Sequence, residues 1–218
     1  MAKIVQTASR KIFCTGVLFF FLAVTLASFA QHYVVSDFEG YSPGDEVIFQ
    51  EPGYSGSTTG IDAATDIVGV SNSQANNILD PSVGTIGVQS YRIYWKWLSP
   101  GTGFARCTTY NVAHQMNPII DFTKGLSIYV KVTQGEIDMS YWVRETGVSG
   151  VIGSSDGASG AIERCTRFVR LSASPEWQYV YFDVPNEPYL GLTGNSVLDG
   201  QWGTLESLVF QAVSGSPA

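Results

Sequence analysis

The sequence predicts an all-β fold, an antiparallel two-sheet β-sandwich of jelly-roll type. Three observations support this fold class. Apolar and polar residues alternate in several short segments, turn signals such as Pro52-Gly53 and Pro100-Gly101 separate the segments, and no segment keeps a helical period for three turns. Many short strands separated by turns are typical of sandwiches and jelly rolls, in which two sheets enclose one core.

Nine segments qualify as strands, and the evidence differs among them. Period-two alternation is clearest at residues 91–97, 126–132, 139–144 and 177–184, where one face is apolar. Apolar composition between turn signals predicts the others, which are residues 33–38, 46–50, 104–110, 162–171 and 205–213. Residues 60–79 give only a weak strand signal, and the Gly/Ser-rich stretch 147–160 predicts a long loop between two strands.

The first thirty residues have the pattern of a secretory signal peptide. A basic region ending at Arg10-Lys11 precedes the apolar run 12–26, and small residues follow up to Ala30. The alternative is a membrane anchor, but the run is shorter than the roughly 20 residues of a full span. We therefore expect cleavage before Gln31, export of a single domain at 31–218, and no membrane attachment afterwards.

The charge of the chain disfavours nucleic acid as a partner. The formal net charge is −7, and the first thirty residues carry three basic residues and no acidic one. The exported domain is therefore more acidic still, whereas binding to a phosphate backbone needs clustered Lys and Arg.

Two cysteines, Cys107 and Cys165, remain after the signal peptide. An oxidising compartment would allow them to form a disulfide, and the alternative is two separate buried thiols. A zinc site has little support, because there is no CxxC spacing.

Four segments together resemble one known family. Residues 35–40 (VSDFEG), 143–147 (VRETG), 182–188 (FDVPNEP) and 194–203 (GNSVLDGQWG) are similar to galactose-binding-like jelly rolls, which occur as carbohydrate-binding modules in secreted bacterial proteins. The resemblance implies a non-catalytic domain, often with a structural calcium ion. It also implies a final acidic strand beside the first one. This chain stops at Ala218 where that strand would begin, so we expect a truncated sandwich without its last strand.

Hard oxygen ligands suit calcium, which makes Glu39, and after it Asp37, the candidate ligands. The alternative is that both are solvated acids of a turn.

Sugar binding needs flat aromatic faces, with planar polar side chains that reach the hydroxyl groups. The polar faces of the predicted strands offer both. We expect Tyr94, Tyr129 and Trp142 to stack on sugar, and Arg92, Arg144 and Glu145 to orient its hydroxyl groups. Trp177, Tyr179 and Tyr181 form a further aromatic stripe. The alternative is that loops cover these faces as well.

Three patterns resemble enzyme motifs. Glu136 and Asp138 resemble the active-site strand of laminarinase-type hydrolases, but the third acid of that strand is absent. Gly153–Gly157 matches G-x-S-x-G without the helix and the later histidine that its mechanism requires. His114 could serve a polysaccharide lyase, although a lone histidine is more often a loop residue.

The sequence therefore predicts a secreted, non-catalytic polysaccharide-binding module, either a monomer or one part of a larger protein. A glycan-cleaving enzyme and a structural cell-surface domain without a ligand are the alternatives.

Overall fold

The alternating segments form the strands of an antiparallel β-sandwich. The structure is a computed structural model that describes residues 36, 38–71, 78–80, 84–109, 117–154 and 161–214. Its elements are η1 (Pro52–Tyr54), β1 (Ile67–Ser71), β2 (Ile78–Asp80), β3 (Gly84–Ile86), β4 (Ser90–Tyr94), β5 (Phe104–Thr108), β6 (Ile119–Asp121), β7 (Leu126–Val130), β8 (Glu136–Glu145), β9 (Ile162–Cys165), β10 (Val169–Ser172), β11 (Gln178–Phe182), η2 (Val184–Asn186), β12 (Tyr189–Gly191) and β13 (Trp202–Ala212).

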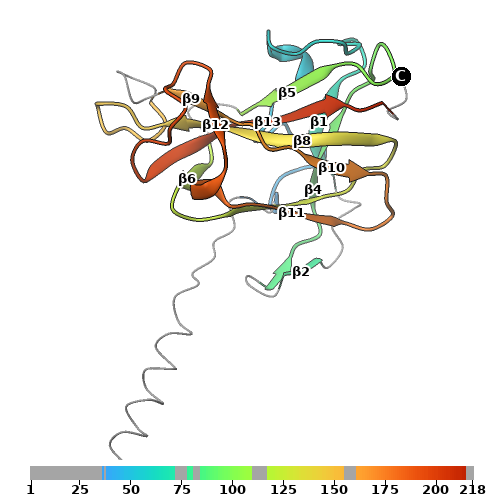
Figure 1. Cartoon of the computed structure of the whole chain (residues 1–218). Helices are drawn as coiled ribbons and strands as arrows, with labels where there is room; N and C mark the ends of the chain where they lie inside the picture. The colour runs from blue at the N-terminus through green and yellow to red at the C-terminus, as the bar shows by residue number, and fades with distance from the viewer. Residues whose placement is uncertain are drawn as a thin grey trace, which may run out of the picture. The chain divides into compact units, whose positions relative to one another are not determined.

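One large sheet organises the fold. Its strand order is β12-β9-β8-β13-β5, with β10 paired to β8 and β6 paired to β13. The long strands β8 and β13 run side by side through its middle (Figure 1). Two further antiparallel pairs, β7–β11 and β1–β4, belong to the same compact unit, and β2–β3 form a small pair of their own.

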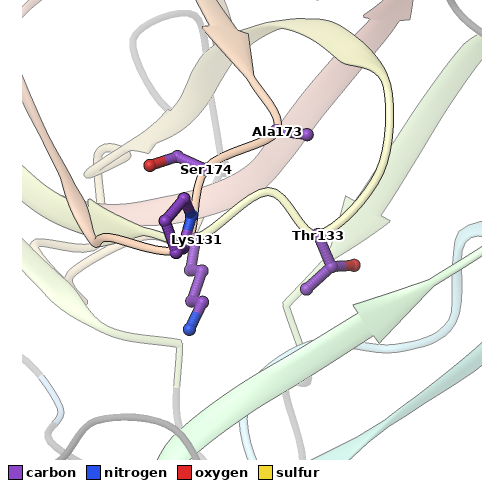
Figure 2. Close-up of a pocket in the computed structure, with 5 residues that line it drawn as sticks. Lys131, Thr133, Ala173 and Ser174 are labelled. Carbon is purple, nitrogen blue, oxygen red and sulfur yellow. The ribbon is translucent and has the colours of Figure 1, made fainter.

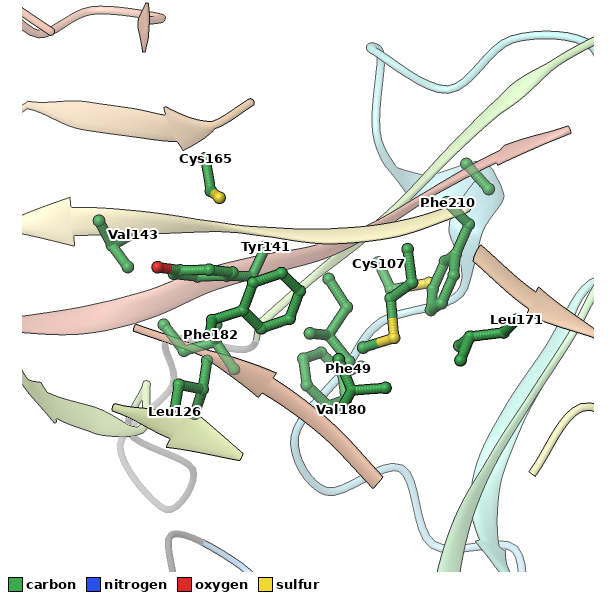
Figure 3. Close-up of a cluster of buried hydrophobic side chains, with 14 of the residues drawn as sticks. Phe49, Cys107, Leu126, Tyr141, Val143, Cys165, Leu171, Val180, Phe182 and Phe210 are labelled. Atoms are coloured by element: carbon green, nitrogen blue, oxygen red, sulfur yellow. The ribbon is translucent and has the colours of Figure 1, made fainter. Parts of the chain in front are cut away.

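The core lies between the large sheet and the β7–β11 and β4 strands. From β8, the side chains of Met139, Tyr141 and Val143 are fully buried, and β11 contributes Val180 and Phe182. The rings of Tyr141 and Phe182 have their centroids 4.7 Å apart and lie beside each other in Figure 3. These are the residues whose alternation marked the inner face, so the predicted inner faces of these strands are confirmed.

The strand predictions differ from the structure in several places. Residues 46–50 contribute only an isolated bridge at Phe49, and residues 162–171 divide into β9 and β10. The strand β1 lies in the stretch 60–79, which gave only a weak strand signal. The strands β2, β3, β6 and β12 were not predicted, because three residues are too few for an alternation to register. The predicted strand 33–38 and the signal peptide 1–30 lie wholly or largely outside the described residues.

A β-bulge interrupts β13 where it crosses β8. Leu205 pairs with Val143 and Ser207 pairs with Trp142, so Glu206 is an extra residue without a partner in the register. Thr109 binds the backbone at this point, because its amide and hydroxyl groups both donate to the carbonyl of Glu206. Because of the bulge, Glu206 and Ser207 both lie on the outer face of the large sheet, where Glu206 meets Arg106 and Arg144.

Candidate functional site

The outer face of the β7–β11 pair presents three tyrosines. Because Val180 and Phe182 point into the core, Tyr179 and Tyr181, which alternate with them, must point outward, and they are 55% and 49% exposed. Tyr129 of β7 is the register partner of Tyr179, and their ring centroids are 5.2 Å apart at 57°. We call Tyr129, Tyr179 and Tyr181 the tyrosine face.

Tyr181 has a glycine beneath its ring. A side-chain carbon at Gly125 would overlap the aromatic ring of Tyr181, so the absence of a side chain lets the ring lie against the backbone before β7. The backbone carbonyl of Tyr181 also accepts a hydrogen bond from Arg167 at 2.6 Å. These contacts fix the strand that carries the ring while leaving about half of the side chain open to solvent.

A hollow of about 350 Å³ lies beside the segments that extend β7 and β10. Lys131 and Thr133 line it from one segment, and Ala173, Ser174 and Pro175 from the other (Figure 2). Two backbone hydrogen bonds hold these segments together, from Ala173 to Gly135 at 2.8 Å and from Ser174 to Val132 at 3.0 Å. The hollow is shallow and largely open to solvent, so it is a depression of the surface and not an enclosed pocket.

The hollow and the tyrosine face share one side of β7. Lys131 follows Tyr129 by two residues, and extended backbone places side chains two apart on the same face, about 6–7 Å from one another. Aromatic rings and an ammonium group are thereby arranged along one surface.

The predicted binding residues do not gather at one place. Arg92 and Tyr94 lie on β4, where the guanidinium of Arg92 is 5.5 Å from the centre of the Tyr94 ring. Tyr129 belongs to β7 instead, whereas Trp142 and Arg144 lie on the large sheet. Alternation indicated that Trp142 and Arg144 face the same side of their strand, but the sequence could not show that the predicted binding residues belong to different sheets.

The expectation that Trp142 presents an open ring is wrong. The residue is only 5% exposed, although it faces away from the main core. The guanidinium carbons of Arg106 and Arg164 lie 4.7 and 5.8 Å from the centre of its indole ring, and Phe104 stacks on it at 5.9 Å. Long side chains from β5 and β9 thus cover this face of the sheet, and no ring face is left for a sugar.

Arg144 takes part in a buried ion triad. Arg106 and Arg144 each place a nitrogen 2.7 Å from a different carboxylate oxygen of Glu206. Arg106 also donates to the hydroxyl of Ser207 at 2.7 Å. Burial lowers the pKa of Arg106, and the carboxylate of Glu206 opposes that shift. Arg144 therefore has a structural partner where the sequence suggested a sugar hydroxyl.

Glu145 faces the interior and not solvent, which corrects its predicted place on a binding surface. It is 1% exposed, and one of its carboxylate oxygens accepts the backbone N–H of Asp199. Burial raises its pKa to about 7, and the charges of Asp199 and Glu163 act in the same direction. A fully buried side chain on the inner face cannot orient a sugar bound outside.

Glu39 is held by backbone donors. One of its carboxylate oxygens accepts the N–H groups of Val88 and Gln89, both at 2.6 Å, and Gly87 leaves the room for that approach. Asp37, the other calcium candidate, lies outside the described residues. Among the residues that the structure describes, no three or more His, Cys, Asp or Glu side chains form a metal-binding group.

The predicted disulfide is absent: Cys107 and Cys165 are both free and buried. They lie on β5 and β9, which are three strand spacings apart in the large sheet. Three spacings amount to about 14 Å, and a disulfide needs Cα atoms within about 7 Å. Leu208 of β13 is the register partner of both Cys107 and Tyr141 of β8, so two strands separate the cysteines. Burial raises the pKa of both thiols.

The enzyme-like acids are occupied by neighbouring side chains. Arg170 binds both carboxylate oxygens of Asp138, one of them at 2.9 Å, and Ser172 donates to Glu136 at 2.9 Å. His114 lies outside the described residues, as does the Gly/Ser motif from residue 155 onward. Glu136 and Asp138 thus sit at an exposed strand end in contact with an arginine, and this arrangement gives no support to the hydrolase alternative.

No family model, curated protein or solved structure matches this chain. In the part of the chain that the structure describes, no helix has the length and apolar character needed to cross a membrane. The fold class, an antiparallel β-sandwich, therefore rests on the strand pairing itself.

Proposed function

We propose that this β-sandwich is a secreted, non-catalytic carbohydrate-binding module, and that it binds polysaccharide on the tyrosine face. The observation that carries the proposal is two exposed tyrosines, Tyr179 and Tyr181, beside the half-buried Tyr129 on an outward sheet face next to a hollow. Monomeric proteins seldom expose several large rings together unless the surface binds something. The jelly-roll resemblance in the sequence points in the same direction.

The chemistry of the tyrosine face suits sugars. A pyranose ring has an apolar C–H face and a polar rim, so it packs on an aromatic ring while its hydroxyl groups hydrogen-bond to polar neighbours. Tyr129, Tyr179 and Tyr181 each provide a ring and a hydroxyl group. Lys131 and Ser174 add donors at the hollow. We expect modest affinity for a single sugar, because few contacts are available and each one displaces water.

A glycan array on the exported domain, followed by calorimetry with the best ligand, tests the proposal. Tyr179→Ala and Tyr181→Ala should each weaken binding about tenfold, which corresponds to about 1.4 kcal/mol. Tyr179→Phe keeps the ring and should retain most of the affinity.

The matched control is Tyr54→Ala, because Tyr54 is a 63% exposed tyrosine on η1. Equal losses in the control and at the tyrosine face would contradict the site. Absence of binding to any polysaccharide would favour a structural domain.

A further inference from the structure

We propose that Glu145 and Glu163 hold a calcium ion beneath the loop formed by residues 192–200. This site is distinct from Glu39 and does not depend on sugar binding.

The two carboxylates are close neighbours on adjacent strands. Glu163 pairs with Val143 in the β8–β9 register, and the amide of Glu145 donates to the carbonyl of Ala161. Glu145 and Glu163 are therefore diagonal neighbours on the same face of the sheet. They are 1% and 0% exposed, so both acidic groups are removed from water.

In each carboxylate, one oxygen accepts a hydrogen bond and the other has no hydrogen-bond partner. Oε1 of Glu163 accepts the N–H of Ser196 at 3.0 Å, and Oε1 of Glu145 accepts the N–H of Asp199. The Oε2 atoms of both residues are buried and have no hydrogen-bond partner, and neither residue forms an ion pair within the described residues. Two adjacent buried carboxylates without a counter-charge are strongly unfavourable, because each has lost its hydration.

The loop above the pair is built to approach it closely. A side-chain carbon at Gly194 would overlap Oε1 of Glu163, so only glycine allows this backbone path. Thr193 accepts the N–H of Ile162 at 3.1 Å, and Ser196 accepts that of Gly191 at 3.0 Å, which ties both sides of the loop to the sheet.

Calcium fits these donors better than other common cations. Ca²⁺ takes six to eight oxygen ligands in flexible geometry, including carboxylates, backbone carbonyls and water. The two unpaired oxygens supply the charge, and carbonyl and water oxygens complete the shell. Mg²⁺ needs a stricter octahedral arrangement and keeps most of its water. The described residues that form this site, Glu145, Glu163 and the loop 192–200, include no cysteine or histidine, which disfavours zinc.

Calorimetric titration of the metal-free protein with CaCl₂ tests the inference directly, and thermal unfolding in EDTA or CaCl₂ gives a second readout. We expect Ca²⁺ about tenfold above its Kd to raise Tm by about 3–6 °C. Glu163→Gln should abolish the binding event and the Tm shift. Glu176→Gln, at an exposed turn, is the matched control and should retain both.

Three results would overturn the inference. The first is an identical Tm of the wild-type protein in EDTA and in CaCl₂ with no heat of binding, which would mean that the two carboxylates share a proton. The second is Ca²⁺ binding that survives in Glu163→Gln and is lost in Glu39→Gln. The third is a preference for Mg²⁺. If Glu163→Gln does not fold, Glu145→Gln with Glu163→Gln replaces it, because that pair of amides carries no buried charge.

Sugar binding by the tyrosine face is measured separately. Loss of Ca²⁺ binding with unchanged glycan affinity, or the reverse, would show which of the two proposals fails.

Discussion

The substitution Glu206→Gln tests the ion triad on the outer face of the large sheet. Glutamine keeps the size of the side chain but removes the charge that two arginines share. Glu206 has a side chain only 4% exposed, and the side chains of Arg106 and Arg144 are 11% and 27% exposed, so water screens the pairs weakly. Removing one member of a buried ion pair costs about 3–5 kcal/mol, because the partner charge stays buried.

We expect the free energy of unfolding to fall by that amount and Tm to fall by about 6–20 °C for a chain of this size. Urea unfolding followed by tryptophan fluorescence gives the measurement, and Trp142, which lies against Arg106, is one of the five tryptophans that contribute to the signal. Glu176→Gln, which makes the same chemical change at an exposed site, should leave the midpoint unchanged. A loss in Glu206→Gln no larger than the roughly 1 kcal/mol of an exposed ion pair would refute the reasoning.

Three further predictions concern the core, the buried acid and the thiols. Phe182→Ala should lower the free energy of unfolding by about 3–5 kcal/mol in urea, because it removes a fully buried ring; a loss below that of an exposed substitution would contradict it. Folding raises the pKa of Glu145 from 4.5 to about 7, so the folded state favours the protonated acid. The free energy of unfolding of the wild type, measured in EDTA relative to that of Glu145→Gln, should therefore fall by about 3 kcal/mol as pH rises from 4.5 to about 7. A rise over that interval would contradict the assignment. Because Cys107 and Cys165 are buried thiols, they should resist alkylation in the native protein. After unfolding in the absence of a reductant both should be alkylated, which mass spectrometry can measure. An unreactive pair would indicate a disulfide.

The sequence predicted well whatever depends on neighbouring residues. Alternation alone placed Met139, Tyr141 and Val143 on the inner face, because successive side chains of a strand point to opposite sides. The same rule turned Tyr179 and Tyr181 outward. The inner and outer sides of a strand are local properties, so a single sequence contains them.

Features that depend on strand order were not predictable in this way. The burial of Trp142 requires Arg106 and Arg164 to come from other strands of the same sheet, and no local pattern encodes that neighbourhood. The cysteine prediction failed for the same reason, since two strands separate β5 from β9. The sequence analysis did not select Glu163. Glu163 lies two residues before Cys165 on β9, so its side chain points to the same inner side of the strand, and this spacing could have identified it as a buried acid.

The bulge in β13 also bears on how this protein could tolerate changes in chain length. Because Leu205 pairs with Val143 and Ser207 with Trp142, excision of Glu206 would leave a regular ladder with every flanking side chain on its present side. A one-residue deletion elsewhere in the strand would instead exchange the inner and outer faces of everything beyond it. The carboxylate between the two arginines is therefore carried by a single residue inserted into an otherwise regular strand.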